Sequence, residues 1–426
     1  MKLQLFLHRT LASLALAAFL TMPATAEVGK TPGASVDSLL ELARQQNPEF
    51  AAARYEAAAS AEKAVPAGAL PDPKFRTEFR DITRMGEQNA TLSPSRVGST
   101  RYLVMQDVPW FGKRDLKREI AELEAEGVKG RSQGTWAELA ARIKTAFAQS
   151  YYLHRNEKLA REILELMIHL EKSAQIRYSA GLGTQQDIIR AQVEQTNMKN
   201  ELLALENERK QVEVRLNVLL ARPATSRLAE PERLRPIPPP VRLDYAKLEE
   251  RVRARNPQLF TETARLKAAE KNRELTYKNR YPDFTFGVSP MQYGNKIKEW
   301  EVMVEVNIPL QQGSRRAQER ESEAMLEAAR SRLDAAANQV LGELSANLAG
   351  LDAAQRTEKL LATNLVPQAE LSFQAALAGY QNSKVDFATL LESQRQIRQA
   401  KQNHIKAQAE AQLRLAEIER LLGEEL

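Results

Sequence analysis

The sequence predicts a mainly α-helical fold with a small β part, built from two tandem repeats of about 200 residues each. Three observations predict this fold. Short motifs recur in the same order in both halves of the chain, two stretches in each half alternate apolar and polar residues, and very long stretches without proline follow them. Recurrence at a nearly fixed offset favours an assembly with rotational pseudo-symmetry, such as a ring or a tube, over most folds with one active site.

The repeated motifs are short, and each keeps its place relative to the others. They are Asn47-Pro48 and Asn256-Pro257, Leu70-Pro71-Asp72 and Tyr281-Pro282-Asp283, Pro109 and Pro309, Tyr178 and Tyr380, and Leu219-Leu220 and Leu421-Leu422. Six prolines between residues 222 and 240 indicate an extended crossover between the halves. We therefore predict a first repeat over residues 27–221, a crossover over 222–242 and a second repeat over 243–426.

The first 26 residues have the pattern of a secretory signal peptide. Lys2 and Arg9 are basic, residues 11–20 are largely apolar, and Ala24-Thr25-Ala26 is a small-residue cleavage site. The alternative is an uncleaved membrane anchor, although the apolar stretch is short for a membrane span. The chain contains no cysteine, which excludes a lipidated cysteine, disulfides and thiolate metal sites.

Charge and hydropathy narrow the possible partners. The chain has 61 basic and 55 acidic side chains, and the two signs alternate along the predicted helices. This mixed pattern is not that of a nucleic-acid-binding surface, so we expect no nucleic-acid partner. After the signal peptide, no stretch approaches 18 consecutive apolar residues, so a membrane-inserted part would have to be made of strands.

The first repeat begins with helices and then changes period. A short helix is predicted over residues 37–47 and an alanine-rich helix over 49–65, with Pro48 between them. The period then falls from about 3.6 to 2, which predicts strands over 73–81 and 99–109.

The second repeat shows the strand pattern more clearly. Val302, Val304 and Val306 alternate with polar residues, and strands are predicted over 283–291 and 299–309. Strands of about ten residues with one apolar face suit a transmembrane β-barrel, in which the apolar face meets lipid. The alternative is a half-buried hairpin of a soluble protein.

Very long helices follow the strands. Residues 114–178 contain no proline and as one helix would be roughly 100 Å long. Apolar residues spaced by three and four predict coiled-coil packing, as at Leu159, Ile163, Leu166 and Leu170. Helical hairpin turns are predicted near residues 179–184 and 380–384.

The strand count predicts an assembly of several chains. Four strands cannot close a barrel, and an open sheet edge cannot lie in lipid because its backbone groups would be unpaired. Two chains would supply eight strands and three would supply twelve, and the smallest well-known transmembrane barrels have eight.

This order of elements resembles the TolC family of outer-membrane efflux channels, and the resemblance covers the whole mature chain. The most specific matching motif is Arg177-Tyr178-x-x-Gly181…Asp187-Ile188-Ile189, although the second turn has Ser383 where the family has glycine. Residues 109–114, Pro-Trp-Phe-Gly-Lys-Arg, resemble most the branch that serves heavy-metal exporters of the resistance-nodulation-division type.

The resemblance implies both an architecture and a set of partners. Three chains would form a 12-stranded transmembrane β-barrel in the outer membrane of a Gram-negative bacterium, continued by a periplasmic α-barrel. A periplasmic adaptor protein and an inner-membrane pump of the resistance-nodulation-division type would be partners, with outer-membrane lipid around the strands. The channel would conduct heavy-metal cations, or alternatively drugs, without performing chemistry and without a cofactor.

The resemblance also implies functional positions at the hairpin turns. A periplasmic gate with acidic rings corresponds to Asp187, Glu392 and the nearby Asp386. The alternative is that acids here only stabilise helix N-termini. The tip that docks the adaptor corresponds to Arg177, Tyr178, Gly181, Gly183, Tyr380 and Ser383.

Aromatic residues gather at the predicted strand ends. They are Trp110, Phe111, Tyr281, Tyr293 and Trp300. This placement suits an aromatic belt at the membrane interface, and the alternative is a small packing cluster.

No motif for catalysis or metal binding is found in the sequence. His154, His169 and His404 are the only histidines after the signal peptide, and their spacing is not that of metal ligands. No nucleophile motif or phosphate-binding loop occurs, so we do not expect an enzyme. The alternative function is a secreted or periplasmic coiled-coil scaffold or adaptor protein without a channel.

Overall fold

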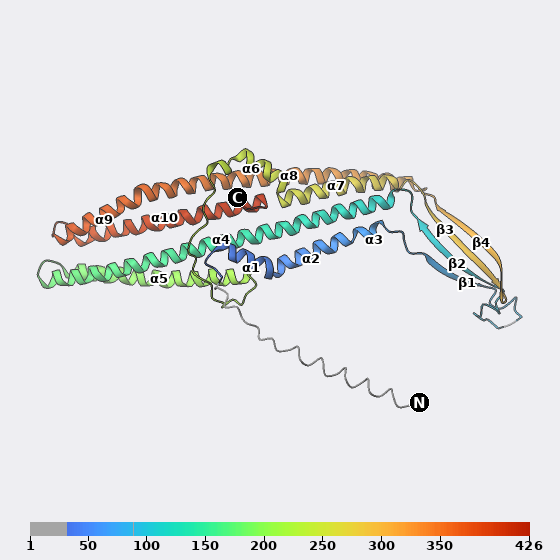
Figure 1. Cartoon of the computed structure of the whole chain (residues 1–426), viewed down its shortest axis with the longest axis horizontal. Coiled ribbons are helices and arrows are strands. Elements are labelled where there is room, and N and C mark those ends of the chain that lie inside the picture. The colour runs from blue at the N-terminus through green and yellow to red at the C-terminus, as the bar shows by residue number, and fades with distance from the viewer. Residues whose placement is uncertain (1–31, 88) are drawn as a thin grey trace, which may run out of the picture.

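The computed structural model describes residues 32–87 and 89–426. The predicted signal peptide, residues 1–26, lies outside the described residues. The described chain is mainly helical with one antiparallel sheet of four strands, which confirms the predicted fold class. The strands lie at one end of an elongated molecule and the turns of two helical hairpins lie at the other end (Figure 1). Within the described residues no helix is long and apolar enough to span a membrane.

The elements of the first repeat follow one another in the predicted order. They are α1 (Val36–Gln46), α2 (Pro48–Glu62), α3 (Ala64–Gly68), β1 (Lys74–Arg80), β2 (Ser99–Val108), α4 (Lys113–Ser179) and α5 (Gln185–Leu219). Helix α4 has 67 residues, and α5 returns antiparallel along it (Figure 1). The expected coiled-coil seam is buried at Leu159, Ile163 and Leu170, whereas Leu166 is partly buried.

The second repeat has the same plan with one added interruption. It comprises α6 (Tyr245–Arg255), α7 (Pro257–Lys278), β3 (Asp283–Tyr293), β4 (Lys296–Asn307), α8 (Gln312–Leu360), a π-helical turn (Leu361–Leu365), α9 (Val366–Gln381) and α10 (Phe387–Leu422). The crossover contains one short 3₁₀ helix, Pro240–Arg242, shortly before α6.

Most predicted boundaries are within one or two residues of the observed ones, and the larger differences have local causes. The helix expected over 49–65 ends at Glu62, and α3 begins at Ala64, two residues before Pro66. The π-helical turn interrupts the second long helix because Pro367 has no N–H to donate to the carbonyl of residue 363. Strand β4 begins at Lys296, three residues earlier than expected, because a bulge at Met291/Gln292 breaks the alternation there.

The sheet runs β1-β2-β3-β4, and the two repeats pair their own strands in the same register. Phe75 lies opposite Val104 in the first repeat, and Phe286 lies opposite Val304 in the second. Strands β2 and β3 join the repeats, with Val104 opposite Val288. Among the strands of residues 32–87 and 89–426, the outer strands β1 and β4 each have one neighbour.

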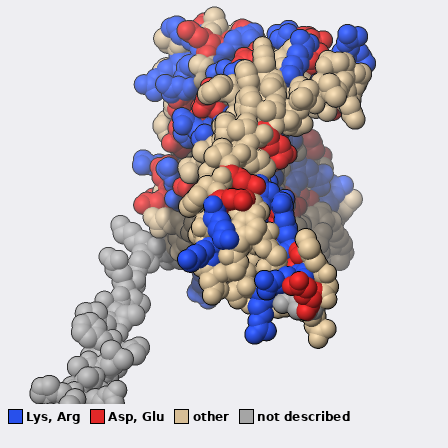
Figure 2. Space-filling model, turned by 90° about the vertical axis from the view of Figure 1, so that its right-hand side faces the viewer, with Lys and Arg blue, Asp and Glu red and all other residues tan. Residues whose placement is uncertain are grey.

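One face of the sheet is apolar and exposed. Val302 and Trp300 of β4 are 78% and 70% exposed, and Val104, Val288 and Phe75 continue this face across the other strands. The opposite face carries charged and hydroxyl side chains, including an ion pair of 3.0 Å between Arg101 and Glu301. Viewed from the strand end, basic and acidic side chains are interspersed among uncharged ones (Figure 2).

The repeated Asn-Pro motifs have the same structural role in both repeats. The side-chain oxygen of Asn47 accepts a hydrogen bond from the N–H of Phe50 at the start of α2, and its amide donates to the carbonyl of Leu219. In the same way, the side-chain oxygen of Asn256 accepts a hydrogen bond from the N–H of Leu259 at the start of α7. Its amide donates to the carbonyl of Leu421. Each asparagine thus satisfies a helix N-terminus and fastens it to the end of a hairpin.

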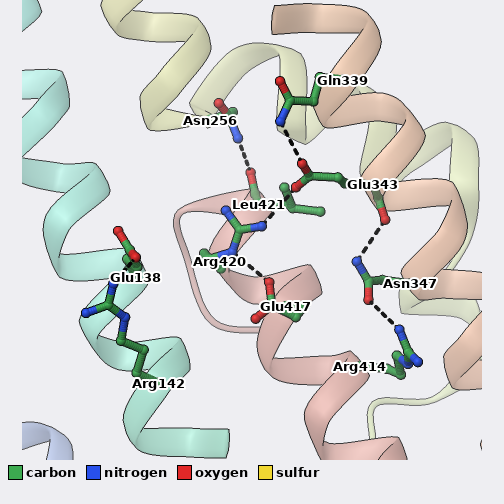
Figure 3. Close-up of polar contacts among 10 residues, drawn as sticks. All are labelled: Glu138, Arg142, Asn256, Gln339, Glu343, Asn347, Arg414, Glu417, Arg420 and Leu421. Atoms are coloured by element: carbon green, nitrogen blue, oxygen red, sulfur yellow. Dashed lines mark hydrogen bonds and ion pairs between the residues drawn. The ribbon is translucent and has the colours of Figure 1, made fainter.

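Ionic contacts strengthen the middle of the molecule. Arg420 of α10 forms ion pairs with Glu417 of the same helix and with Glu343 of α8 (Figure 3). The buried carboxylate of Glu419 contacts Lys144 of α4 at 2.8 Å and Arg235 of the crossover at 2.9 Å. These contacts join both repeats and the crossover at one level of the molecule.

Candidate functional site

The candidate site consists of the two hairpin turns and the helix starts that follow them. Gly181 in the first turn has φ +72°, and Ser383 in the second has φ +57°. Both residues therefore adopt the left-handed conformation that glycine tolerates best. Ser383 replaces the glycine expected by resemblance, yet the turn keeps the same local backbone conformation.

Arg177 joins the two turns. Its guanidinium donates to the Ser383 hydroxyl at 2.7 Å and to the Gln381 carbonyl at 3.1 Å, both in the second hairpin. It also lies 4.8 Å from the centre of the Tyr380 ring, which is a cation–π distance. A single side chain of the first repeat therefore holds the second hairpin at its tip.

The equivalent tyrosines of the two hairpins differ in their surroundings. Tyr178 is 49% exposed, whereas Tyr380 is 4% exposed and packs against Phe387. Burial raises the pKa of the Tyr380 hydroxyl, and the nearby negative charge of Asp187 raises it further. The Tyr380 hydroxyl has no hydrogen-bond partner within the described chain.

Two of the three predicted gate acids stabilise helix starts. At the start of α5, the Asp187 carboxylate accepts a hydrogen bond of 3.4 Å from the N–H of Thr184. Asp386 caps α10 by accepting from the N–H of Thr389 at 2.8 Å, and hydrogen bonds from Thr389 lower its pKa. Both acids therefore stabilise helix N-termini, which was the alternative to a gate role. Both lie at the tip of the molecule.

Glu392, the third predicted acid, lies in a groove between α5 and α10. The groove has a volume of about 930 Å³ and is lined by Ile189, Val193, Leu391, Glu392 and Arg395, among others. Arg395 forms an ion pair of 3.0 Å with the buried Glu194. The groove therefore combines apolar and charged side chains.

Several residues of this groove were missed by the sequence analysis. Ile189 and Val193 are about half exposed, although both are apolar and four residues apart on one face of α5. Their spacing was available in the sequence, but it resembled an ordinary packing stripe. The bridging role of Arg177 was also missed, because it depends on how the hairpins approach each other.

The predicted interface aromatics form two groups at opposite ends of the sheet. Trp110 stacks on Tyr281 at 5.1 Å and meets Phe111 edge-on at 5.8 Å, next to the helices. Tyr293 and Trp300 lie at the other end, near the β3–β4 turn. The two levels are separated by roughly 25 Å along the strands.

The described residues contain no group of three or more His, Cys, Asp or Glu side chains that could hold a metal ion. Two of the three histidines have local partners. His404 contacts Glu358 at 3.0 Å, and His154 contacts the carbonyl of Ser150 at 2.9 Å.

A family model described as outer membrane efflux protein matches residues 39–222 and residues 248–424. A search of curated proteins found no match.

Several solved structures are similar in fold. One is the outer membrane protein VceC of Vibrio cholerae, with a TM-score of 0.76, 16% identity and coverage of 92% of this chain and 96% of that one. Another is the open-state MtrE outer membrane channel of Neisseria gonorrhoeae, with a TM-score of 0.69, 15% identity and coverage of 92% and 89%. CusC, from a study of transmembrane channel formation, has a TM-score of 0.73, 14% identity and coverage of 91% and 92%.

Proposed function

The chain belongs to the outer membrane efflux protein family, and we propose that it forms the exit duct of a tripartite efflux system. The protein is an outer-membrane efflux channel and not an enzyme. In the proposed assembly, three copies form one tube through the outer membrane of a Gram-negative bacterium and into the periplasm. A periplasmic adaptor and an inner-membrane pump of the resistance-nodulation-division type deliver the substrate.

The exposed apolar face of the four-stranded sheet is the observation that carries this proposal. An apolar face with Trp300 and Val302 mostly exposed is costly in water and stable against lipid. The opposite face is mostly polar at the two outer strands, as expected for the wall of a water-filled channel, and carries the buried Leu103, Met105 and Met291 on its two middle strands. Three copies would supply twelve strands, which removes the two unpaired edges of each chain.

The arrangement of aromatic side chains supports the same placement. Trp110, Phe111 and Tyr281 lie at one end of the strands, and Tyr293 and Trp300 lie at the other. The roughly 25 Å between these levels is close to the height of the apolar band in outer-membrane barrels. Trp110, Phe111 and Tyr281 would contact one interface and Trp300 the other. Tyr293 does not fit the predicted belt, because it lies on the polar face of β3 and its hydroxyl contacts Glu299 at 3.1 Å.

The hairpin tips would form the periplasmic gate. Threefold symmetry would turn Asp187, Asp386 and Glu392 into rings of three carboxylates, which favour cations and bind divalent ions. Arg177 already ties one hairpin to the other within a chain, with hydrogen bonds to Ser383 and Gln381. Breaking these contacts would be part of opening.

The groove between α5 and α10 suits docking of the adaptor. Ile189 and Val193 offer exposed apolar surface, and Arg395 offers a positive charge. A helical tip from the adaptor, with apolar residues on one face, would bury these side chains. The turn residues Tyr178, Gly181 and Gly183 lie at the same end and would extend the contact.

Heavy-metal cations are the proposed substrate, and drugs are the alternative. The proposal rests on the resemblance of residues 109–114 to the heavy-metal branch and on the acidic residues at the tip. The test is growth of a strain lacking the gene on graded metal salts and, separately, on graded drugs. Rescue on metals alone supports the proposal, and rescue on drugs alone overturns the substrate class while leaving the channel in place.

Single-channel conductance in planar bilayers tests the gate. Because Asp187 also caps α5, Asp187→Asn is the informative variant, since asparagine still accepts the capping hydrogen bond but has no charge. We expect Asp187→Asn combined with Glu392→Gln to raise conductance and to weaken block by divalent cations. Unchanged current and block would remove both residues from the gate.

A further inference from the structure

The two free edges of the sheet complement each other. In the proposed channel β4 of one copy meets β1 of the next, and we propose that this junction has one particular register. Val306 lies opposite Phe75, Val304 opposite Thr77 and Val302 opposite Phe79. This inference rests on the proposed channel and adds the register of its intermolecular junction. It also assigns two ion pairs to that junction, Glu305 with Arg76 and Glu301 with Arg80.

The register follows from the internal repeat. Lys74 lies opposite Met105 in the first repeat, and the equivalent pair in the second repeat is Thr285 opposite Glu305. The same equivalence relates Phe75 and Val104 to Phe286 and Val304. The strand pairs of the two repeats therefore correspond residue by residue.

The junction between the repeats supplies the template for the junction between copies. Strand β2 pairs with β3 so that Val104 lies opposite Val288 and Met105 lies opposite Gly287. In the equivalent positions, Val304 of β4 would lie opposite Thr77 of β1, and Glu305 would lie opposite Arg76. Closing the tube requires only that the second junction repeats the first.

The side-chain faces agree with this register. Val302, Val304 and Val306 lie on the exposed apolar face of β4, and their proposed partners Phe75 and Phe79 lie on the same face of β1. A shift by one residue would place apolar side chains on the polar face. The apolar face would thus continue from one copy to the next without a break.

On the polar face, basic residues predominate on the outer strand β1 and acidic residues on the outer strand β4. On β1 this face carries Lys74, Arg76 and Arg80, with Glu78 as the only acid. On β4 it carries three acids, Glu299, Glu301 and Glu305, and its lysines, Lys296 and Lys298, lie beyond them next to the β3–β4 turn. The internal junction of β2 with β3 has no such pattern, since Met105 there faces Gly287.

The acidic edge has room for new partners. Glu305 makes no hydrogen bond or ion pair within residues 32–87 and 89–426, and its side chain is exposed. In the same described part of the chain, the one ion pair of Arg76 is with Glu78 of its own strand, at 3.8 Å. Glu301 already pairs with Arg101, so Arg80 would join an existing ion pair.

This distribution of charge also disfavours pairing of β1 with β1 and of β4 with β4. Two β1 edges brought together would place basic side chains opposite one another, and two β4 edges would oppose acids, which destabilises a strand pair. Only head-to-tail pairing of β4 with β1 brings opposite charges together. Such a heterologous contact repeats from copy to copy and closes into a ring.

Disulfide trapping tests the register, and the absence of native cysteines makes the background clean. Thr77→Cys with Val304→Cys places two cysteines directly opposite each other in the proposed register. We expect oxidation to link the copies, so that a covalent oligomer survives in denaturing gels without reductant. The matched control, Thr77→Cys with Val302→Cys, places the cysteines diagonally, at about 7–8 Å, where a disulfide strains the backbone.

Charge exchange tests the ion pairs without a disulfide. Arg76→Glu and Glu305→Arg should each cause loss of the detergent-resistant oligomer at moderate temperature, and the double variant should restore it. Arg84→Glu in the β1–β2 loop is the control and should leave the oligomer unchanged. A double variant that is less stable than either single variant would overturn the ion pair.

The outcomes separate this inference from the proposed channel. Cross-linking by the control pair, but not by Thr77→Cys with Val304→Cys, would overturn the register while a membrane-inserted oligomer still supports the channel. An unsubstituted protein that stays monomeric and outside the membrane would overturn the proposed channel itself, and the inference with it. Cross-linking of the proposed pair with rescue by charge exchange supports both.

Discussion

The two helical hairpins share one plan but differ along their length. In the first, α4 runs for 67 residues without interruption. In the second, the outgoing helix is divided into α8 and α9 by a π-helical turn next to Pro367. A π turn and a proline both weaken the regular hydrogen-bond ladder, so the second hairpin has a defined place to bend and the first does not.

The tips of the two hairpins differ in how far equivalent side chains are exposed. The first tip exposes Tyr178 and Ile189, which is 50% exposed, whereas their equivalents Tyr380 and Leu391 are 4% and 6% exposed. The first hairpin therefore offers a surface for a partner, and the second is held against the first. In our proposal, recognition and gating are divided between two copies of one repeat.

The inner ends of the hairpins differ as well. Glu419 pairs with Lys144 and Arg235, whereas the equivalent Asn217 donates to the carbonyl groups of Ala224 and Ser226. Both positions are buried and both fasten the crossover. One junction is ionic and the other is neutral, which gives them different responses to substitution and to pH.

The largest expected effect comes from breaking the ionic junction. Glu419→Ala should lower the free energy of unfolding by roughly 3 kcal/mol, the lower end for a broken buried ion pair, because the buried Lys144 keeps only the mostly exposed Glu425 as a partner. Asn217→Ala should cost about 1–3 kcal/mol, because only neutral hydrogen bonds are lost. Denaturant unfolding in detergent, followed by circular dichroism, measures both, and equal losses would contradict the contrast.

Acid should remove part of the same stabilisation. Burial alone would raise the pKa of Glu419, but the hydrogen bond from Arg235 and the charge of Lys144 lower it overall. Its pairing therefore stabilises fully above the ordinary glutamate pKa of about 4.3 and is lost as the pH falls through the lower folded value. Unfolding measured from pH 6 downwards should show this loss, and Glu419→Gln should remove the part of the slope that comes from this group.

At the tips, equivalent substitutions should have opposite consequences. Leu391→Ala should cost about 2–3 kcal/mol of stability because it leaves a cavity between the hairpins. Ile189→Ala should change stability by less than about 0.5 kcal/mol because its side chain is half exposed. Ile189→Asp should nevertheless reduce efflux in cells at unchanged channel level, and normal efflux would argue against docking at this groove.

The Asn-Pro caps should behave alike in both repeats. Asn47→Ala and Asn256→Ala each remove a helix cap and a hydrogen bond to a hairpin end, and each should cost about 1–2 kcal/mol. Thermal unfolding of the two variants provides the comparison. A difference well beyond 1 kcal/mol would show that the repeats are not equivalent here.

The smallest effect is expected at the turns. Gly181→Ser should cost about 1 kcal/mol because serine is strained at φ +72°. Ser383→Gly relieves the same strain but loses the hydrogen bond from Arg177, so the two effects should nearly cancel. Thermal unfolding should therefore separate Gly181→Ser from the wild type and leave Ser383→Gly close to it.

Periodic features were predictable from the sequence. Alternating residues such as Val302, Val304 and Val306 predicted the strands, and the Asn-Pro motifs predicted helix starts. These signals are local, since each arises from which side of one element is buried. The bulge at Met291/Gln292 shifted the parity, and the start of β4 was misplaced for that reason.

The features of the candidate site that were missed depend on how distant segments meet. Arg177 contacts Ser383 across more than 200 positions of sequence, and no local pattern specifies that contact. Tyr178 and Tyr380 occupy equivalent places in the sequence, and only the packing of one hairpin on the other distinguishes them. Asp187 and Asp386 were identified as acids at helix starts, but their hydrogen bonds required the backbone geometry.

A trimeric outer-membrane channel can be tested by the mass of the protein extracted in mild detergent from an outer-membrane fraction. We expect a particle with three times the mass of the mature chain, after correction for bound detergent. A monomer recovered outside the membrane would contradict it, because the four strands would then have no barrel to close and the scaffold alternative would explain the chain better.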